Sequence, residues 1–396
     1  MKGGYASGGI FGEAVDRIGG EPISARMARK APIRHLDPTL LLVTMLLAAY
    51  GAVMVFSATA NSQDASVLDP QLYVKRQIAY LVAGVVVLLV LSAFDYRHLR
   101  SFAPFIYGAT IIGLVVVLTP LGDVQKGASR WIDLGAFQAQ PSEMAKVAII
   151  ITLAALFAEK KGELRGLDVL IGLIVVAFPA VLIFLEPDLG TMMVFVAITG
   201  AMLLVGGAKL RHFLVLAAVC LLAIGAIIQF DVLHDYQKER ITSFLDPNPD
   251  VRSYGYNLTQ SKIAIGSGGF RGKGLDSENT QTSLDFVPEQ HTDFIFTAVG
   301  EQLGFIGSAT MLCLFAFLIW RALRIAAMSR DMFGALLATG AAALWSFQLF
   351  VNVGMTMGIM PITGIPLPFI SYGGSSLITN FAAVGLLMNV HMRRFL

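Results

Sequence analysis

The sequence contains little charge. Only 14% of its 396 residues are Asp, Glu, Lys or Arg, whereas 56% are hydrophobic. Soluble domains carry about 25% charged residues, so this composition excludes an ordinary soluble protein. The net charge of +2 gives no sign of a nucleic-acid partner, and we expect none.

Several other features are missing. The two cysteines, Cys220 and Cys313, lie in apolar runs, which argues against a disulfide or a cysteine metal site. The six histidines are scattered without ligand spacing. Residues 1–37 are Gly-rich and basic and hold no apolar core of a cleavable signal peptide. We expect them to form a disordered cytoplasmic tail.

Long apolar runs dominate the rest of the chain. Runs of about 20 residues predict membrane-spanning helices rather than barrel strands. We place the spans at residues 39–59, 78–94, 102–119, 143–158, 168–185, 191–206, 212–230, 293–320, 333–357 and 374–391. The predicted fold is therefore an all-α polytopic membrane domain over 38–396, with ten transmembrane helices.

The distribution of Lys and Arg predicts the orientation. With the N-terminus in the cytoplasm, that side collects 18 of the 29 basic residues and the outer side 10, while Lys146 falls inside a span. Both termini are then cytoplasmic. Residues 231–292 become a large extracytoplasmic loop between helices 7 and 8, in which the stretch up to Gly266 favours a short surface helix. The Pro- and Gly-rich segment 358–376 is apolar yet irregular, which requires burial in protein or a cavity.

The end of that loop carries the densest polar cluster. Glu289, His291 and Asp293 lie within five residues, at the point where an apolar helix begins. Acids at a membrane edge are costly and often functional, so Asp293 is a candidate general base. The alternative is that Asp293 only caps the helix. Glu301 lies eight residues further on, on the same helix face, and indicates a polar cavity.

Further candidate residues lie at other predicted outer ends of spans. Glu143 and Lys146 share one helix face, and Lys146 could meet a phosphate or only neutralise Glu143. Arg130 precedes Trp131, a pairing that suits a phosphosugar. Asp188, in a short polar segment, could hold a cation, position Lys146 or simply form a turn. Residue chemistry alone fits either an enzyme acting on a lipid-linked phosphosugar or a transporter.

At these motifs the chain resembles the SEDS family (shape, elongation, division and sporulation), from about residue 38 to its end. The resemblance rests on Arg130-Trp131, Gln140–Lys146, Pro187–Thr191, Gln260–Gly269, Pro288–Phe296 and Pro361–Ser376. Pro288–His291 and Thr363–Phe369 favour the rod-shape branch of the family over its division branch.

The resemblance implies a peptidoglycan glycosyltransferase of the bacterial cytoplasmic (inner) membrane, which polymerises lipid II into glycan strands for cell elongation. By position, Asp293 matches the essential acid of the family, and Glu143, Lys146 and Asp188 match polar cavity residues. We further expect Arg130, Glu289, His291 and Glu301 to contact substrate. The implied partner is a class B penicillin-binding protein, a transpeptidase.

Three alternatives remain at this point. The first is a flippase for the same lipid, although the sequence shows no convincing internal repeat. The second is a scaffold that only recruits partners, and the third is the division-type enzyme of the same family. A divalent cation, Mg²⁺ or Mn²⁺, would suit the pyrophosphate leaving group, and its ligands are unknown. No organic cofactor is expected.

Overall fold

A computed structural model describes most of the chain. The described residues are 35–60, 70–125, 128–133, 135, 137–160, 163–230, 237–238, 240, 244, 254–275, 277, 280–282, 284, 286 and 289–395. All but the last three residues of the predicted tail, and much of the predicted loop over 231–292, lie outside these ranges.

The structure is mainly helical, as predicted. Its helices are α3 (Pro38–Ala60), α4 (Pro70–Ala93), α5 (Tyr96–Val117), α6 (Pro141–Ala158), α7 (Gly166–Leu185), α8 (Leu189–Val205), α9 (Leu210–Gln229), α11 (Tyr254–Gly268), α12 (Ile295–Ala327), α13 (Met332–Met357) and α14 (Gly374–Arg393). Among the described residues, eight helices are long and apolar enough to cross a membrane. Helix α8 (189–205) and the part 210–222 of α9 are shorter apolar stretches at two further predicted spans.

Local chemistry explains several helix starts. Pro38, Pro70 and Pro141 each open a helix, because proline has its φ angle already set and lacks an N–H that would be unpaired there. The second helix therefore begins eight residues before the predicted residue 78. The surface helix expected before Gly266 is also present, as part of α11.

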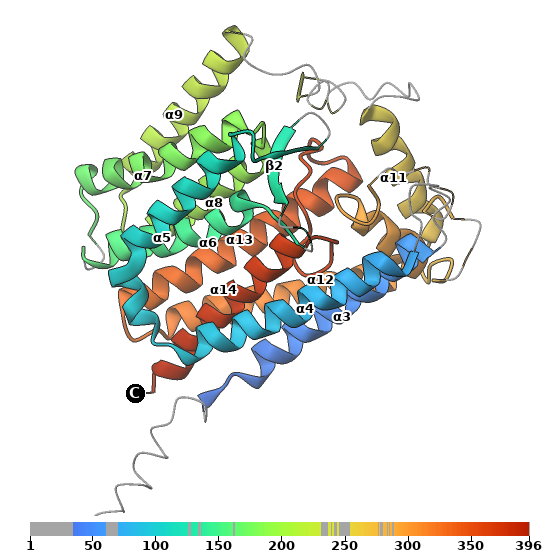
Figure 1. Ribbon diagram of the computed structural model, residues 1–396, viewed down its shortest axis with the longest axis horizontal. Coiled ribbons are helices and arrows are strands. Elements are labelled where there is room, and N and C mark those ends of the chain that lie inside the picture. Colours follow the sequence, from blue (N-terminus) through green and yellow to red (C-terminus); the bar gives the residue numbers. More distant parts are fainter. Residues whose placement is uncertain are drawn as a thin grey trace, which may run out of the picture.

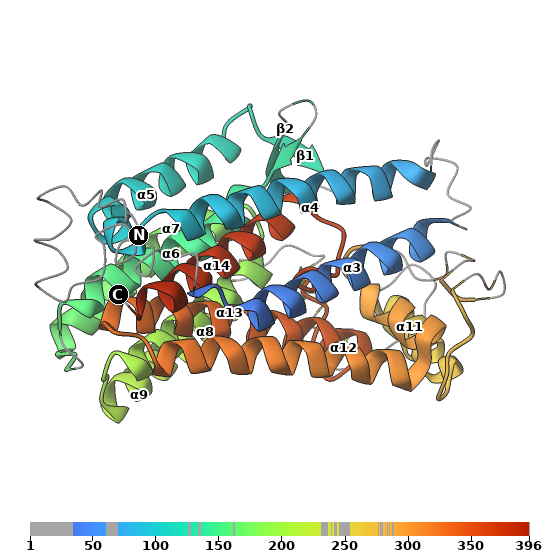
Figure 2. The same ribbon diagram turned by 90° about the horizontal axis from the view of Figure 1, so that it is seen from below.

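The helices lie side by side, with α6, α13 and α14 in the middle (Figure 1). In Figure 1, helices α3 and α4 run along one side and α5, α7 and α9 lie toward the other, whereas the view of Figure 2 shows α5 and α9 at opposite sides of the bundle. The share of buried residues follows this order: it is 89% for α14 and 67% for both α6 and α13, but 17% for α5. The central three helices are thus enclosed by protein.

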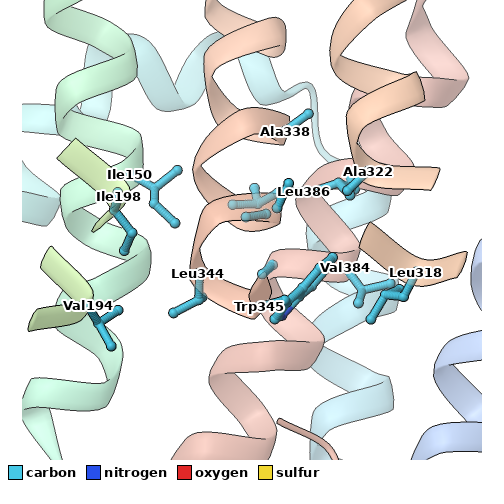
Figure 3. Close-up of a cluster of buried hydrophobic side chains, with 14 of the residues drawn as sticks. Ile150, Val194, Ile198, Leu318, Ala322, Ala338, Leu344, Trp345, Val384 and Leu386 are labelled. Atoms are coloured by element: carbon cyan, nitrogen blue, oxygen red, sulfur yellow. The ribbon is translucent and has the colours of Figure 1, made fainter. Parts of the chain in front are cut away.

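The apolar core lies between these central helices and their neighbours. Figure 3 shows Ile150 of α6, Trp345 of α13 and Val384 of α14 in one buried cluster. The Trp345 indole N–H donates to Asn380 Oδ1 at 2.9 Å, so the largest core side chain also ties α13 to α14. Burying the ring therefore leaves no indole donor unpaired.

Irregular segments gather at one end of the bundle, which we call the outer end: α6, α12 and α14 begin there. Strands β1 (Asp123–Gln125), β2 (Ala128–Asp133) and β3 (Gln138–Ala139) form a small antiparallel sheet. The all-α prediction missed this sheet. The segment 358–373, between α13 and α14, is non-helical, and most of its residues are buried or partly buried, as predicted.

Helix α12 is broken near its outer end. Gly304 has φ 65° and ψ −157°, which only glycine adopts easily. A Cβ at Gly304 would lie 2.3 Å from the backbone nitrogen of Gly272. The amide of Phe305 donates to the carbonyl of Gly269 at 2.9 Å. The loop after α11 therefore fits directly into the break and separates a short helical piece, 295–303, from the long one.

Candidate active site at the outer end

Asp293 lies immediately before α12, partly exposed, in the turn that leads into Ile295. Its backbone is held from α13: Asn352 Nδ2 donates to the carbonyl of Asp293 at 2.9 Å and to that of Ile365 at 2.8 Å. One buried amide thus fixes two segments that are far apart in the sequence.

Arg240 and Gly364 lie next to the Asp293 carboxylate. A Cβ built on Gly364 would be 3.2 Å from Asp293 Oδ2 and 3.7 Å from Arg240 Nη1. Gly364 has φ 74°, and Arg240 Nη1 donates to the carbonyl of Thr363 at 3.1 Å. The sequence prediction missed Arg240, because nothing in the sequence marks it among the many cations of the long loop.

The residues just before Asp293 are also anchored. Thr292 Oγ1 donates to Glu289 Oε2 at 3.1 Å, and its carbonyl accepts from Ser371 Oγ at 2.7 Å. The amide of Tyr372 donates to the carbonyl of His291 at 2.9 Å. The predicted cluster of Glu289, His291 and Asp293 is therefore seated on the irregular segment before α14.

His291 belongs to an aromatic group. Its ring centroid lies 4.9 Å from that of Tyr73 and 5.9 Å from that of Tyr372, and the two tyrosine rings are 5.1 Å apart. Burial raises the pKa of Tyr372 to about 12, so its hydroxyl stays protonated at neutral pH. These rings form an amphipathic wall beside the turn that carries Asp293.

Lys146 and Glu143 form a buried ion pair in the first turns of α6. The Nζ–Oε1 distance is 2.5 Å, and the two side chains are 1% and 3% exposed. This is the self-neutralising arrangement that the sequence left open as an alternative. Their expected role in substrate binding stays a prediction.

Asp188 caps α8. Its carboxylate accepts from the amide of Thr191 at 3.1 Å and from the Thr191 hydroxyl at 2.8 Å. The Ser142 hydroxyl, in the first turn of α6, lies 3.4 Å from Asp188 Oδ2. Asp188 therefore joins the α7–α8 turn to the helix that carries Lys146, and its role toward substrate stays a prediction.

Arg130 of β2 holds the same turn. Its Nε donates to the carbonyl of Glu186 at 3.0 Å and its Nη2 donates to that of Pro187. The Glu186 side chain is buried, and burial raises its pKa to about 8, helped by the negative charge of Asp188 and opposed by Arg130. Glu186 is thus largely uncharged at neutral pH, which its sequence motif did not reveal.

Glu301 contacts a different part of the structure from Asp293. It is fully buried, and Lys273 Nζ lies 2.7 Å from its Oε1. The amide of Gln281 donates to Oε1 at 2.7 Å, while the amide and hydroxyl of Thr282 donate to Oε2 at 3.0 and 2.6 Å. Both oxygens are therefore occupied by the loop. The expected contact of Glu301 with substrate stays a prediction.

Within the described residues, no three His, Cys, Asp or Glu side chains come close enough together to hold a metal ion. Mg²⁺ usually keeps several waters and binds through one or two carboxylates plus substrate phosphates. Asp293, which is partly exposed, supplies one such carboxylate at this end of the bundle.

The fold and the site define a polytopic helical membrane protein that presents an anchored, partly exposed acid beside an arginine at one end of the bundle. The sequence profile of the cell cycle protein family of FtsW, RodA and SpoVE matches residues 38–395. The chain belongs to this family, which is the SEDS family indicated by its motifs.

Named relatives agree with this membership. The chain is 39% identical to the peptidoglycan glycosyltransferase MrdB of Escherichia coli strain K12 over 360 residues, which cover 91% of this chain and 94% of MrdB. It is 37% identical to the stage V sporulation protein E of Bacillus subtilis, over 89% of this chain and 96% of that protein. A probable FtsW of Geobacter metallireducens is 36% identical, over 91% and 96%.

Solved structures share the fold. A chain of a peptidoglycan synthase complex, described as coordinating polymerization and crosslinking, superposes with a TM-score of 0.74 at 30% identity, covering 91% of this chain and 98% of that one. The rod shape determining protein RodA of Thermus thermophilus gives a TM-score of 0.67 at 28% identity, with the same coverage.

Proposed function

We propose that this chain is a peptidoglycan glycosyltransferase that polymerises lipid II during cell elongation, with Asp293 as its general base. The observation that carries this role is the placement of the Asp293 carboxylate. It is partly exposed, its backbone is clamped by Asn352, and it faces the same side of Gly364 as Arg240. The names of the relatives support the reaction, and the higher identity to MrdB than to FtsW supports the elongation branch.

The reaction needs one base. Asp293 takes the proton of the 4-hydroxyl of the acceptor's N-acetylglucosamine, and that oxygen forms a bond to C1 of the donor's N-acetylmuramic acid. The bond from C1 to the pyrophosphate oxygen breaks, undecaprenyl pyrophosphate leaves with the electron pair, and the anomeric centre inverts from α to β. Because pyrophosphate is already a good leaving group, the second carboxylic acid used by glycoside hydrolases is unnecessary.

Cations stabilise the charge that develops on the pyrophosphate. Arg240 is the best placed, since it is partly exposed and next to Asp293. Lys146 is buried on Glu143, and Arg130 donates to backbone carbonyls, so we assign them supporting roles. Asp293 would hold a divalent cation, which when bound would supply further charge stabilisation.

The aromatic wall and Glu289 would guide the sugars. Tyr73, His291 and Tyr372 present ring faces beside the base, and such faces pack on the apolar side of a sugar ring. Glu289, one turn before Asp293, is held by Thr292 and offers a hydrogen-bond acceptor for sugar hydroxyls.

The reaction also requires a defined topology and a partner. We propose that ten helices cross the bacterial inner membrane: the eight candidate spans together with α8 and α9. Both termini are then cytoplasmic, and the outer end faces the lipid II pool. We propose a class B penicillin-binding protein as partner, because a structural relative belongs to a complex that couples polymerization to crosslinking.

The test is lipid II polymerisation by the purified full-length chain together with its class B partner. Asp293→Asn should lower the rate about 10²–10⁴-fold, the usual contribution of a general base, without changing the thermal unfolding midpoint. Asp133→Asn, an exposed acid in β2, is the matched control and should keep native activity.

Two other outcomes would reassign the function. Equal polymer from the native chain and Asp293→Asn would remove Asp293 from the mechanism. If neither forms polymer although the transpeptidase partner is active and Mg²⁺ is present, lipid II flipping should be measured in sealed vesicles. Transfer of lipid II across the bilayer there would make the chain a transporter.

A further inference from the structure

The buried pair Glu143–Lys146 lies at the same level of the bundle as polar residues on α13. Helices α6 and α13 run in opposite directions and touch where Gly340 meets Ile150. Gln348 lies about 12 Å along α13 from that contact, and Glu143 lies about 10 Å along α6 in the same direction. Seven residues bring Glu143 back to the face of Ile150, and eight residues place Gln348 about 80° around α13 from Gly340. Gln348 and the ion pair therefore lie at the same depth in the bundle.

Helix α14 brings a third polar group to this level. Its first turn is tied to the start of α6, since Ser375 Oγ donates to the carbonyl of Gln138 at 3.0 Å and accepts from the amide of Gln140 at 2.9 Å. Helices α6 and α14 both run inward from this point. One turn further along each helix, Thr379 comes level with Glu143.

These groups share a second property: their polar atoms lack partners. Glu143 Oε2, both amide atoms of Gln348, and Thr379 Oγ1 have no hydrogen-bond partner among the described residues. Asn352 Oδ1, one turn from Gln348 on the same face of α13, has none there either. None of the four residues is more than 4% exposed.

Such a grouping is costly unless something small and polar fills it. Each unpaired buried polar atom destabilises the folded state, and membrane depth offers no bulk water. Ordered internal water usually makes about three hydrogen bonds to polar groups of this kind. The mixture fits water, because the carboxylate accepts, the amide both donates and accepts, and the hydroxyl does either.

We propose that Glu143, Gln348, Thr379 and Asn352 enclose an ordered-water site that links the Glu143–Lys146 pair to the residue clamping Asp293. Gln348 and Thr379 are then positioning residues: they hold Glu143, and through it the Lys146 ammonium, in the orientation that serves the reacting pyrophosphate. This positioning role rests on the proposed glycosyltransferase function, whereas the water site does not depend on it.

The test uses shape-conserving substitutions in the full-length chain with its partner. Gln348→Met and Thr379→Val remove the polar atoms at nearly constant volume. They should lower the turnover of lipid II about tenfold or more with little change in KM, and they should lower the unfolding midpoint, because Glu143 loses its bridging water. Thr379→Ser keeps a hydroxyl and should retain most of the turnover.

A control sits in the same helix bundle. Thr339 on α13 is 5% exposed, like Thr379 at 4%, but its hydroxyl already donates to the carbonyl of Ala335 at 2.9 Å. Thr339→Val therefore removes a buried hydroxyl outside the site. Turnover losses as large in Thr339→Val as in Thr379→Val would overturn the positioning role.

The unfolding midpoint separates the two parts of the proposal. If the unpaired atoms are dry, Gln348→Met and Thr379→Val should raise the midpoint, and that result overturns the water site. If the native chain makes no polymer, the positioning role fails with the proposed function. The midpoints of the same variants then still decide whether the water site exists.

Discussion

Asp293 lies just before the short helical piece of α12 and Glu301 lies near its end, eight residues on, yet their surroundings are opposite. Glu301 is fully buried, and both of its oxygens accept hydrogen bonds from the loop. Asp293 is partly exposed, and Asn352 anchors its backbone carbonyl. Glu301, whose two carboxylate oxygens accept hydrogen bonds from the loop, stabilises the structure. Asp293, in an anchored and partly exposed turn, can react.

The largest effect on stability should come from removing the Glu301 carboxylate. Glu301→Ala leaves the Lys273 ammonium and the donors of Gln281 and Thr282 without their acceptor. Removing one partner from a buried charge pair costs about 3–5 kcal/mol, so we expect a lower unfolding midpoint. A denaturation series on the native chain, Glu301→Ala and Asp293→Asn checks this. Equal unfolding midpoints for Glu301→Ala and Asp293→Asn would contradict the stabilising role of Glu301.

Gly364→Ala should disturb the position of the Asp293 carboxylate. A non-glycine residue at φ 74° costs about 1–3 kcal/mol, and the added Cβ would press on Asp293 Oδ2 at 3.2 Å. Gly135→Ala is the matched control, because Gly135 has φ 82° but no atom within 4 Å of the added Cβ. Both variants should lose stability, and only Gly364→Ala should also lose turnover per folded molecule. Equal turnover in both would contradict the contact with Asp293.

Arg240→Gln tests whether a positive charge beside Asp293 contributes to the reaction. If Arg240 stabilises the developing negative charge, its loss should lower turnover about ten- to a hundredfold and leave the fold intact. Arg271→Gln removes an exposed loop arginine and should have little effect. Steady-state polymerisation rates decide between them, and native activity in Arg240→Gln would exclude it from the reaction.

Glu186 predicts a smaller, pH-dependent effect. Its pKa is about 8 in the folded protein, against an ordinary value of 4.5, so the folded state keeps a proton that the unfolded chain releases. Stability should therefore fall as pH rises from about 4.5 to about 8, by at most about 1.4 kcal/mol per pH unit from this group. Glu186→Gln should flatten that slope in unfolding midpoints measured at pH 5–8. Parallel slopes in the two proteins would contradict the assignment.

The sequence predicted the features that depend on local pattern. Apolar runs located the helices, and the Pro- and Gly-rich composition of 358–376 predicted an irregular, buried segment. The motifs identified the family and drew attention to Asp293. What the pattern could not do was separate Asp293 from Glu301, because the sequence places both acids on one face of the predicted helix and only the loop that covers Glu301 distinguishes them.

The missed features all depend on distant contacts. Arg240 reaches the site by donating to Thr363, which is 123 residues away along the chain. Glu186 is uncharged because of its burial, which its neighbours in sequence do not specify. Single residues in an unremarkable sequence context carry no signal of such contacts.

The break at Gly304 has a consequence for how the catalytic end tolerates change. In a continuous α-helix, inserting one residue turns everything beyond it by about 100°. Here the long piece of α12 ends at Gly304, and the short piece takes its direction from the loop fitted into the break. The long piece of α12 can therefore change in sequence, tilt or rotate while the position and orientation of Asp293 stay the same. The long piece of α12 holds the helix in the bundle, and the short piece 295–303 positions Asp293.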